Sequence, residues 1–387
     1  MSNLLLLDKY KNIRQRTEQI CRPLEKEDYV VQPIVDVSPP KWHLGHTSWF
    51  FETFILKQYF EGYTEFNNQY NYVFNSYYET VGARVIRTDR GNLSRPSVDD
   101  VYEYRKYVNE FMELLLGSAE LSSSLTELIT LGLNHEQQHQ ELLLTDIKYI
   151  LGHNPLFPAY TTSNANVDVD LTRTGEFVTI KEGVYEIGFQ GNGFCFDNEL
   201  GRHKVYVQEV EISRDLVTNA EYLEFINDGG YQDFKHWHAE GWDWVKHNQA
   251  KAPLYWHFVN GEWMNYTLQG LENVAADAAL CHINFYEAAA FASWKGMRLP
   301  TEAEWEIASN ELSWGSRWEW TGSAYLPYPN FSKAPGAIGE YNGKFMVNQM
   351  VLRGASVATS AHHSRSTYRN FFQPQHQWQF TGIRLVR

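Results

Sequence analysis

The sequence predicts an α+β protein with a helical first half and a loop-rich second half that contains short strands. Residues 1 to about 160 carry apolar side chains at helical spacing, between serine and proline start signals. From about Glu176 onward, short β-like runs alternate with Gly, Asn and Asp. This second half holds all of the 13 tryptophans except Trp42 and Trp49, which is typical of a fold held together by aromatic packing.

Four helices are expected in the first half, and their start signals are clear. Ser38 precedes two prolines and can cap free backbone N–H groups, while Ser97 with Asp100 and Ser124 with Glu127 resemble capping boxes. The expected helices cover residues 4–20, 40–60, 98–116 and 124–151. Four helices with one long connection predict a four-helix bundle.

That long connection, residues 63–96, holds five tyrosines and four arginines. Loops of this length are usually functional or disordered, and the aromatic content indicates order. A polar linker is expected at residues 161–175, which gives domains at residues 1–160 and 176–387. In the second domain, strands are predicted at FVTI, VYEIGF and KVYVQEVEI, and helices at residues 219–226 and 286–294.

Charge and composition exclude several classes of protein. With 33 basic and 47 acidic side chains the net charge is −14, so the positive charge on which nucleic-acid binding depends is missing. No window approaches the ~20 apolar residues of a membrane span, and the first residues lack a small-residue cleavage site. The 3 cysteines are scattered and odd in number, which favours a reducing compartment. We therefore expect a cytoplasmic protein whose metal ligands, if any, are His, Asp or Glu.

The motif His135-Glu136-Gln137-Gln138-His139 is the sharpest local signal. On a helix, two histidines four residues apart project from one face and can bind one ion. The motif also matches the HExxH pattern of zinc peptidases, in which the glutamate is the general base. The longer peptidase signature would place Gly and His at positions that hold Leu142 and Thr145 here. Alternatively, the two histidines simply line a polar face of the bundle.

A third ligand would have to come from another helix, and Trp42-His43-Leu44-Gly45-His46 is the obvious source. His46 is the first choice, and His43 is an alternative because the two are three residues apart and share a side of the helix. Three neutral imidazoles leave positions open for substrate and oxygen, as an oxygen-activating iron requires. Ligand type alone equally allows zinc.

Together, the motifs WHLGH, NSYYE, HEQQH, RLPTEAEWE and RNFF resemble the sulfoxide synthases of ergothioneine biosynthesis, the EgtB family. The resemblance spans nearly the whole chain. It implies a DinB-like four-helix bundle followed by a formylglycine-generating-enzyme-like domain of C-type-lectin-like fold, with non-haem Fe(II). The family's three iron ligands carry over to His46, His135 and His139.

The second half supports the resemblance through FDNE, VTNAEYLEFI, RLPTEAEWEIA and VLRGAS, which are similar to the formylglycine-generating fold. Enzymes that make formylglycine carry cysteines in and after the last of these segments. Here Val357, Ala358 and Thr359 follow it, and no cysteine comes after Cys281. The fold is therefore expected without that chemistry.

The family reaction uses Fe(II) and O2 to join a thiol to carbon 2 of the imidazole of hercynine, which is trimethylhistidine, and to oxidise the sulfur to a sulfoxide. Tyr77 and Tyr78 resemble the catalytic tyrosines of the branch that keeps them in the helical half, and a tyrosine can donate a proton. The alternative is that both rings only pack in an aromatic loop.

Hercynine carries a quaternary ammonium and a carboxylate, which call for aromatic faces and hydrogen-bond donors. By position in the family motifs, Gln138 and Asn370 are expected to bind hercynine. The aromatic faces are expected from Phe371, Phe372 and Trp378.

The thiol substrate is predicted to be cysteine. The family branch that uses γ-glutamylcysteine carries an acidic residue and an arginine where this chain has Phe372 and His376. The cysteine carboxylate would need a cation, and Arg87 and Arg90 are chosen from the four arginines of the tyrosine-rich connection.

Three alternatives remain open at this point. The first is a related enzyme that makes the ovothiol-type isomer or uses selenium, whose ovothiol members usually append a methyltransferase. The second is a zinc hydrolase with Glu136 as base, and the third is a ligand-binding module without activity. For the leading reading, an EgtB-type enzyme, we expect small-molecule partners, namely hercynine, a thiol and O2, and no obligate protein partner.

Overall fold

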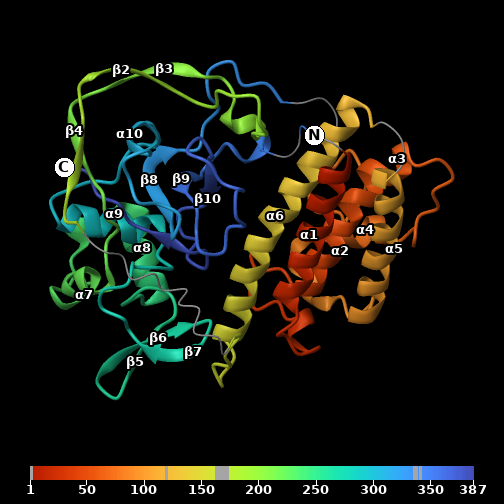
Figure 1. Cartoon of the computed structure of the whole chain (residues 1–387). Coiled ribbons are helices and arrows are strands. Elements are labelled where there is room, and N and C mark those ends of the chain that lie inside the picture. Colours follow the sequence, from red (N-terminus) through yellow and green to blue (C-terminus); the bar gives the residue numbers. More distant parts are fainter. Residues whose placement is uncertain (1–2, 118–120, 162–173, 334–338, 340–341) are drawn as a thin grey trace. The chain divides into compact units, whose positions relative to one another are not determined.

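The computed structural model describes the chain in two compact units (Figure 1). The described residues are 3–117, 121–161, 174–333, 339 and 342–387. One unit comprises Met1–Thr161 with Ala358–His363, and the other comprises Thr162–Val357 with Ser364–Arg387. The first is helical and the second contains all the strands of the described residues, so the predicted α+β class is confirmed. Most of the predicted linker, residues 162–173, lies outside the described residues.

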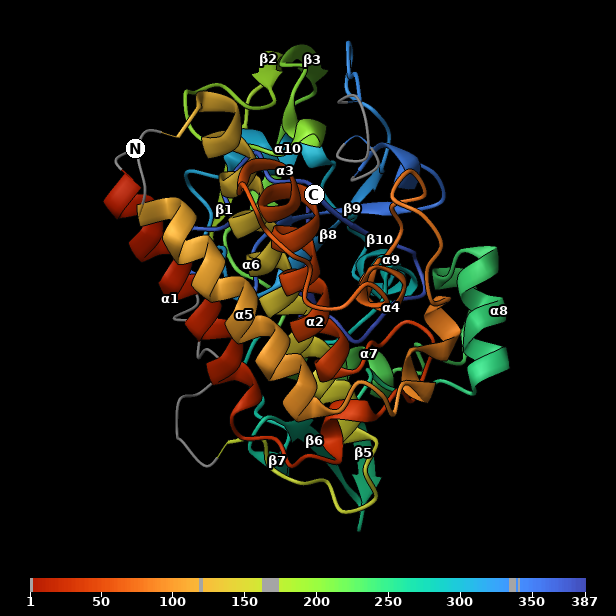
Figure 2. The ribbon, with the colours of Figure 1, turned by 90° about the vertical axis from the view of Figure 1, so that its right-hand side faces the viewer.

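The four predicted helices are present in the first unit. They are α1 (Asn3–Cys21), α2 (Pro40–Phe51), α5 (Val98–Gly117) and α6 (Ser123–Gly152). Both α1 and α2 pack against α5 and α6 (Figures 1 and 2). The second helix continues past α2 through a π-helical turn, Glu52–Leu56, into α3 (Lys57–Tyr59). π-Helical turns are rare in proteins, and those that occur are often found near functional sites.

Side-chain caps fix the starts of α5 and α6. The backbone N–H of Ser97 donates to Asp100 (2.8 Å) and that of Asp100 to the Ser97 hydroxyl (3.1 Å), which confirms the predicted box. The cap predicted at Ser124 is wrong. The helix begins at Ser123, so the N-cap residue is Ser122, whose hydroxyl accepts from the backbone N–H of Leu125 (3.2 Å).

The long connection between α3 and α5 is ordered, as its aromatic content predicted. It contains α4 (Tyr70–Phe74) and a 3-10 turn, Arg87–Asn92. The buried carboxylate of Glu52 accepts hydrogen bonds from the hydroxyls of Tyr63 and Tyr104 (both 2.6 Å) and from the backbone of Phe66 (3.1 Å). These bonds tie the start of the connection to the π-helical turn and to α5.

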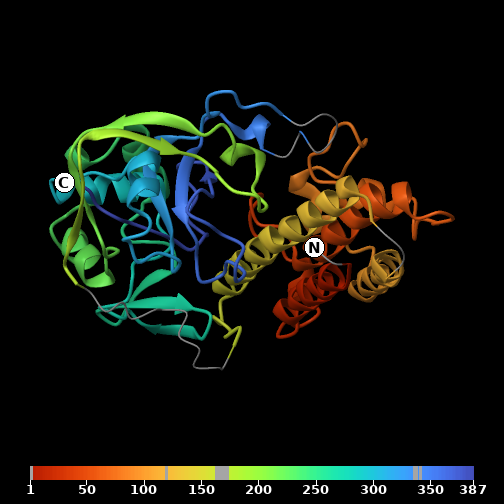
Figure 3. The same ribbon diagram turned by 45° about the horizontal axis from the view of Figure 1, so that its top comes forward.

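The second unit is built from small sheets. Two antiparallel pairs join β1 (Phe177–Ile180) to β4 (Val210–Ser213) and β2 (Gly183–Ile187) to β3 (His203–Val207). Figure 3 shows the green hairpin of β2 and β3 along the edge of this unit. A meander joins β5 (Trp256–Val259), β6 (Glu262–Thr267) and β7 (Gly270–Asn273). A four-stranded sheet has the order β10 (Asn370–Phe372), β9 (Met350–Gly354), β8 (Trp318–Ala324) and β11 (Thr381–Gly382).

The described part of the second unit also contains four α-helices and several buried tryptophans. The helices are α7 (Asn219–Asn227), α8 (Ala239–Asn248), α9 (Phe285–Trp294) and α10 (Glu302–Ala308), and α10 packs against β1, β2, β3, β4, β8 and β9. Trp305, Trp318 and Trp320 are at most 1% exposed, and the indole N–H of Trp305 donates to Glu319 (2.6 Å). Aromatic packing therefore does hold this unit together, as its tryptophan content predicted. Across the described residues, no helix is long and apolar enough to cross a membrane.

Candidate metal centre

The helical unit brings three histidines together. His46 comes from α2, and His135 and His139 come from one face of α6. One ring nitrogen from each lies within 4.8 Å of the others, and the Nε2 atoms of His46 and His135 are 3.2 Å apart. The three side chains are 0%, 2% and 9% exposed. These are the three residues that the sequence motifs selected as candidate ligands.

A backbone contact orients His46. Its Nδ1 lies 2.7 Å from the carbonyl oxygen of Phe74, and because a carbonyl only accepts, Nδ1 must carry the proton. The lone pair is then on Nε2, the atom that faces His135. The indole of Trp42 stacks on the same imidazole at a centroid distance of 4.7 Å. The ring is therefore fixed with its donor atom directed at the cluster.

Burial keeps all three imidazoles neutral. It lowers the pKa of His135 to about 3 and also lowers the pKa values of His46 and His139, to which neighbouring imidazoles contribute. Neutral imidazole is the form that binds metals. Three convergent neutral nitrogens therefore fit a divalent transition metal and leave coordination positions for other ligands.

Gly45 allows this arrangement because a side chain there would collide with Phe74. A Cβ at position 45 would overlap the Phe74 ring, and the carbonyl of the same phenylalanine holds His46. We expect Gly45→Ala to lower the free energy of unfolding by ~1–3 kcal/mol through overpacking, and to weaken metal binding. Urea unfolding and metal titration measure the two effects. Gly117→Ala, where a Cβ meets open space, is the control, and equal unfolding of both variants would contradict the expectation.

Glu136 does not face the cluster of three histidines. Its carboxylate is 0% exposed and accepts hydrogen bonds from Thr17 (2.7 Å), Arg14 (3.0 Å) and Arg105 (2.5 Å), which belong to α1 and α5. Burial alone would raise its pKa, but Arg105 and Arg14 lower the pKa of Glu136 to about 2. A carboxylate clamped in this way cannot act as a general base at the metal. The structure thus contradicts the zinc-hydrolase role of Glu136, because the HExxH spacing does not say which way the glutamate points.

Trp49 connects the two candidate tyrosines to the histidine cluster by ring contacts. The Tyr78 ring is 0% exposed and packs 5.6 Å from Trp49, whose ring stacks 5.4 Å from His46. The Tyr77 ring stacks 4.8 Å from that of Tyr78 and is less buried. Asn75 holds the turn, because its amide donates to the backbone oxygen of Tyr78 (3.1 Å) and its oxygen accepts from the backbone N–H (3.2 Å). A proton-donor role for either tyrosine stays a prediction.

Arg90 differs from the other arginines of the connection. It is 5% exposed, its guanidinium carbon lies 3.4 Å from the ring centre of Trp42, and it donates to the hydroxyl of Ser38 (2.8 Å). Ser38 does not cap α2 as predicted, because Pro39 is the N-cap residue and the hydroxyl of Ser38 is used by Arg90. Arg87, the other selected arginine, is exposed and donates to the backbone of Asp36 (2.5 Å).

A short segment from late in the chain, Ala358–His363, belongs to the helical unit, and no motif in the sequence predicted this. Its hydrogen bonds to α6 join Thr359 to Glu141 (2.8 Å), Ser360 to Gln140 (2.6 Å) and His363 to Gln137 (3.3 Å). Gln138, one of the two residues predicted to bind hercynine, stands between Gln137 and His139 in the chain and is partly exposed.

The remaining predicted residues lie in the second unit. Phe371 stacks on Tyr325 at 4.1 Å, and the side-chain oxygen of Asn370 accepts from the Phe371 backbone (2.9 Å). The rings of Phe372 and Trp378 both face His376, at 6.4 Å and 4.6 Å. Their roles stay predictions.

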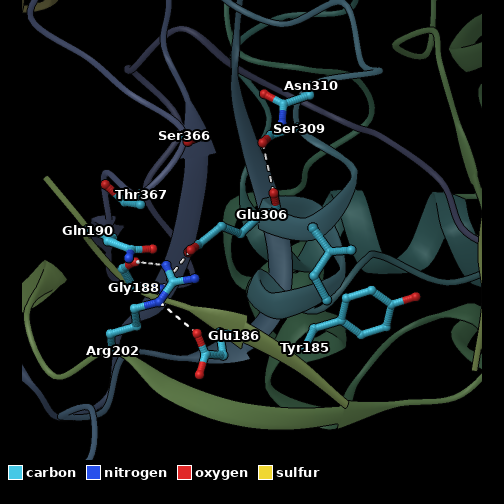
Figure 4. A pocket seen from close by; sticks show the side chains of 11 residues that line it. Tyr185, Glu186, Gly188, Gln190, Arg202, Glu306, Ser309, Asn310, Ser366 and Thr367 are labelled. Carbon is cyan, nitrogen blue, oxygen red and sulfur yellow. Dashed lines mark hydrogen bonds and ion pairs between the residues drawn. The ribbon is translucent and has the colours of Figure 1, made fainter. Parts of the chain in front are cut away.

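The second unit also has a surface cavity of about 430 Å³ (Figure 4). It is lined by Tyr185, Glu186, Gly188, Gln190, Arg202, Glu306, Ile307, Ser309, Asn310, Ser366 and Thr367. Its charged groups are already paired, since Arg202 binds Glu186 (3.1 Å) and Glu306 accepts from the backbone of Gly188 (2.6 Å). None of the predicted site residues lines this cavity.

Comparison with known proteins identifies both domains. The DinB superfamily model matches residues 9–143, and the sulfatase-modifying factor enzyme 1-like domain model matches residues 163–317. Hercynine oxygenases of Mycolicibacterium smegmatis and Mycobacterium tuberculosis are each 28% identical over 66% of this chain and 70% of their own. The chain is therefore similar to hercynine oxygenases along a stretch that includes parts of both domains. Ergothioneine biosynthesis protein 1 of Schizosaccharomyces pombe is 23% identical over 76% of this chain and 44% of its own.

The histidine cluster lies wholly within the DinB-superfamily match. His46, His135 and His139 all fall in residues 9–143. The resemblance drawn from the motifs is therefore confirmed at the level of domains and relatives. All three histidines belong to the first unit.

Proposed function

We propose that this protein is an Fe(II)- and O2-dependent sulfoxide synthase that joins cysteine to carbon 2 of hercynine in ergothioneine biosynthesis. The observation that carries the proposal is the cluster of three neutral imidazoles in a chain similar to the hercynine oxygenases. The reaction is balanced without an external reductant. Forming the carbon–sulfur bond and oxidising the sulfur each remove two electrons, so one O2 supplies one oxygen to the sulfoxide and one to water.

The proposal gives each candidate site residue of the helical unit a role. His46, His135 and His139 would hold the iron, which supplies O2 activation when bound. Tyr78, in the aromatic cluster around Trp49, would donate a proton to the reacting oxygen, and Tyr77 is the alternative donor. Arg90 would bind the carboxylate of the thiol substrate. The buried rings around the cluster would keep bulk water away from the reacting atoms.

The test is a reconstitution with defined substrates. Metal-free protein is loaded with Fe(II) under anaerobic conditions and then mixed with hercynine, cysteine and ¹⁸O-labelled O2, with γ-glutamylcysteine in parallel. We expect hercynylcysteine sulfoxide with one ¹⁸O atom, formed with Fe(II), absent with Zn(II) and absent in His139→Ala. Mass spectrometry measures the product. If iron-loaded protein couples neither thiol to hercynine, the proposal is wrong, and peptide hydrolysis by the zinc-loaded form would support a hydrolase instead.

A further inference from the structure

Two residues outside the metal cluster, His43 and Asp146, form a buried chain that ends at His139. The Nδ1 atom of His43 lies 2.9 Å from Nδ1 of His139, and Nε2 of His43 lies 3.0 Å from a carboxylate oxygen of Asp146. His43 and Asp146 are 2% and 3% exposed. His43 comes from α2 and the other two residues from α6, so the chain links the two helices that carry the cluster.

The direction of each hydrogen bond in this chain follows from the carboxylate. An ionised carboxylate only accepts, so Nε2 of His43 must carry the proton that it shares with Asp146. The Nδ1 atom of a neutral His43 is then an acceptor, and the proton between the two rings must belong to Nδ1 of His139. This leaves the lone pair of His139 on Nε2, the atom available to a metal.

We propose that Asp146 and His43 are positioning residues that fix the tautomer and ring orientation of His139 for metal binding. His43 is therefore not a fourth ligand, because both of its nitrogens are engaged by Asp146 and His139. A ligand histidine commonly donates its second N–H to an oxygen acceptor, and His46 does so to Phe74. For His139 an imidazole held by a carboxylate takes the place of that oxygen. This inference rests on the proposed metal centre.

A purely structural role for Asp146 is the competing explanation. The same carboxylate oxygen that binds His43 also accepts the backbone N–H of Ser38 (2.9 Å), just before α2. Removing the carboxylate would therefore disturb the start of α2 as well. The decisive variants are accordingly at His43, where one ring nitrogen can be imitated at a time.

The experiment compares His43→Asn with His43→Gln. The oxygen of asparagine can occupy the position of Nδ1 and still accept from His139, whereas the amide of glutamine reaches the position of Nε2 and contacts only Asp146. We expect His43→Gln and Asp146→Ala to weaken binding of Co(II) and Fe(II) by about 10–100-fold, the range for such outer contacts. His43→Asn should stay within a few-fold of the unaltered protein. Thr145→Val removes a buried hydroxyl that donates to the backbone oxygen of Leu142 within α6 (2.8 Å), and should not change metal affinity.

A second readout separates positioning from stability. In the Co(II)-loaded protein, the Nδ1 proton of His139 should give a hyperfine-shifted, slowly exchanging NMR signal that persists in His43→Asn and disappears in His43→Gln. Equal metal affinity in the two variants, whether both normal or both weak, would overturn the proposal. If the unaltered protein binds neither metal, the metal centre itself fails. Tight binding by the unaltered protein with no difference among variants refutes the positioning role alone.

Discussion

Replacing Glu136 with glutamine is expected to lower the free energy of unfolding by ~3–5 kcal/mol, the typical cost of breaking a buried ion pair. The substitution preserves size but leaves Arg14 and Arg105 buried, at 2% and 0% exposed, without the charge that both of them bind. Glu18 pairs with Arg105 from a more exposed position (3.0 Å) and compensates only partly. Urea unfolding at neutral pH measures the effect, and Glu127→Gln on the exposed face of the same helix is the matched control.

The effect of Glu136 should depend on pH in a defined direction. Its pKa is about 2 in the folded protein against the ordinary glutamate value of 4.5, so the unfolded chain takes up the proton first as pH falls. The stability contributed by the ionised carboxylate is fully present above about pH 4.5 and is lost as pH falls towards 2. The difference in free energy of unfolding between the unaltered protein and Glu136→Gln should therefore shrink as pH falls from about 4.5 to about 2. The pKa difference corresponds to a decrease of ~3 kcal/mol.

This pair of measurements also separates the two readings of HEQQH. A general base at the metal would lose activity on substitution and leave stability nearly unchanged. The hydrogen bonds from α1 and α5 to Glu136 on α6 instead predict a large loss of stability when Glu136 is replaced. A variant that unfolds like the unaltered protein but is inactive would contradict the structural role of Glu136.

Local sequence signals predicted the elements, and the structure adds the directions in which side chains point. The cap of α5 and the helical periodicity of α6, which places His135 and His139 on one face, depend on residues a few positions apart and could be predicted. Glu136 and His139 lie in the same motif, yet one binds α1 and α5 while the other faces the cluster. That difference depends on Arg14 and Arg105, which are distant in sequence. No local pattern could supply it.

The same reasoning explains which site residues were missed. Asp146 stands seven residues after His139 on α6, on nearly the same face, but its partner is His43 on another helix. The anchors between Ser360 and Gln140 join segments 220 residues apart. Arg84, Arg87, Arg90 and Arg95 are equivalent in the sequence, and only burial and contacts distinguish them. A single sequence shows which residue types could bind a metal or a substrate, but it does not show which residues far apart in the chain contact each other.

Arg90 should discriminate between thiols that carry a carboxylate and those that do not. Within the described part of the chain, no carboxylate lies at ion-pair distance from its guanidinium, and its Nε has no hydrogen-bond partner. Burial, followed by the neighbouring Arg87, lowers the pKa of Arg90, and the Asp146 carboxylate offsets this only in part. An anionic ligand would supply the missing partner, and the proposed cysteine substrate brings a carboxylate.

We therefore expect Arg90→Met to lower kcat/KM for cysteine by about 10–200-fold, which corresponds to the ~1.5–3 kcal/mol of a hydrogen bond to a charged group. Cysteamine, which has the same thiol and amine but no carboxylate, should react with the variant and the unaltered protein at similar rates. Arg87→Met is the matched control, because Arg87 lies in the same 3-10 turn but is exposed. Arg90→Lys should recover part of the preference, since lysine keeps the charge but loses the planar fork. If Arg90→Met still prefers cysteine over cysteamine as strongly as the unaltered protein, another group binds the carboxylate, and the buried guanidinium only supports Trp42.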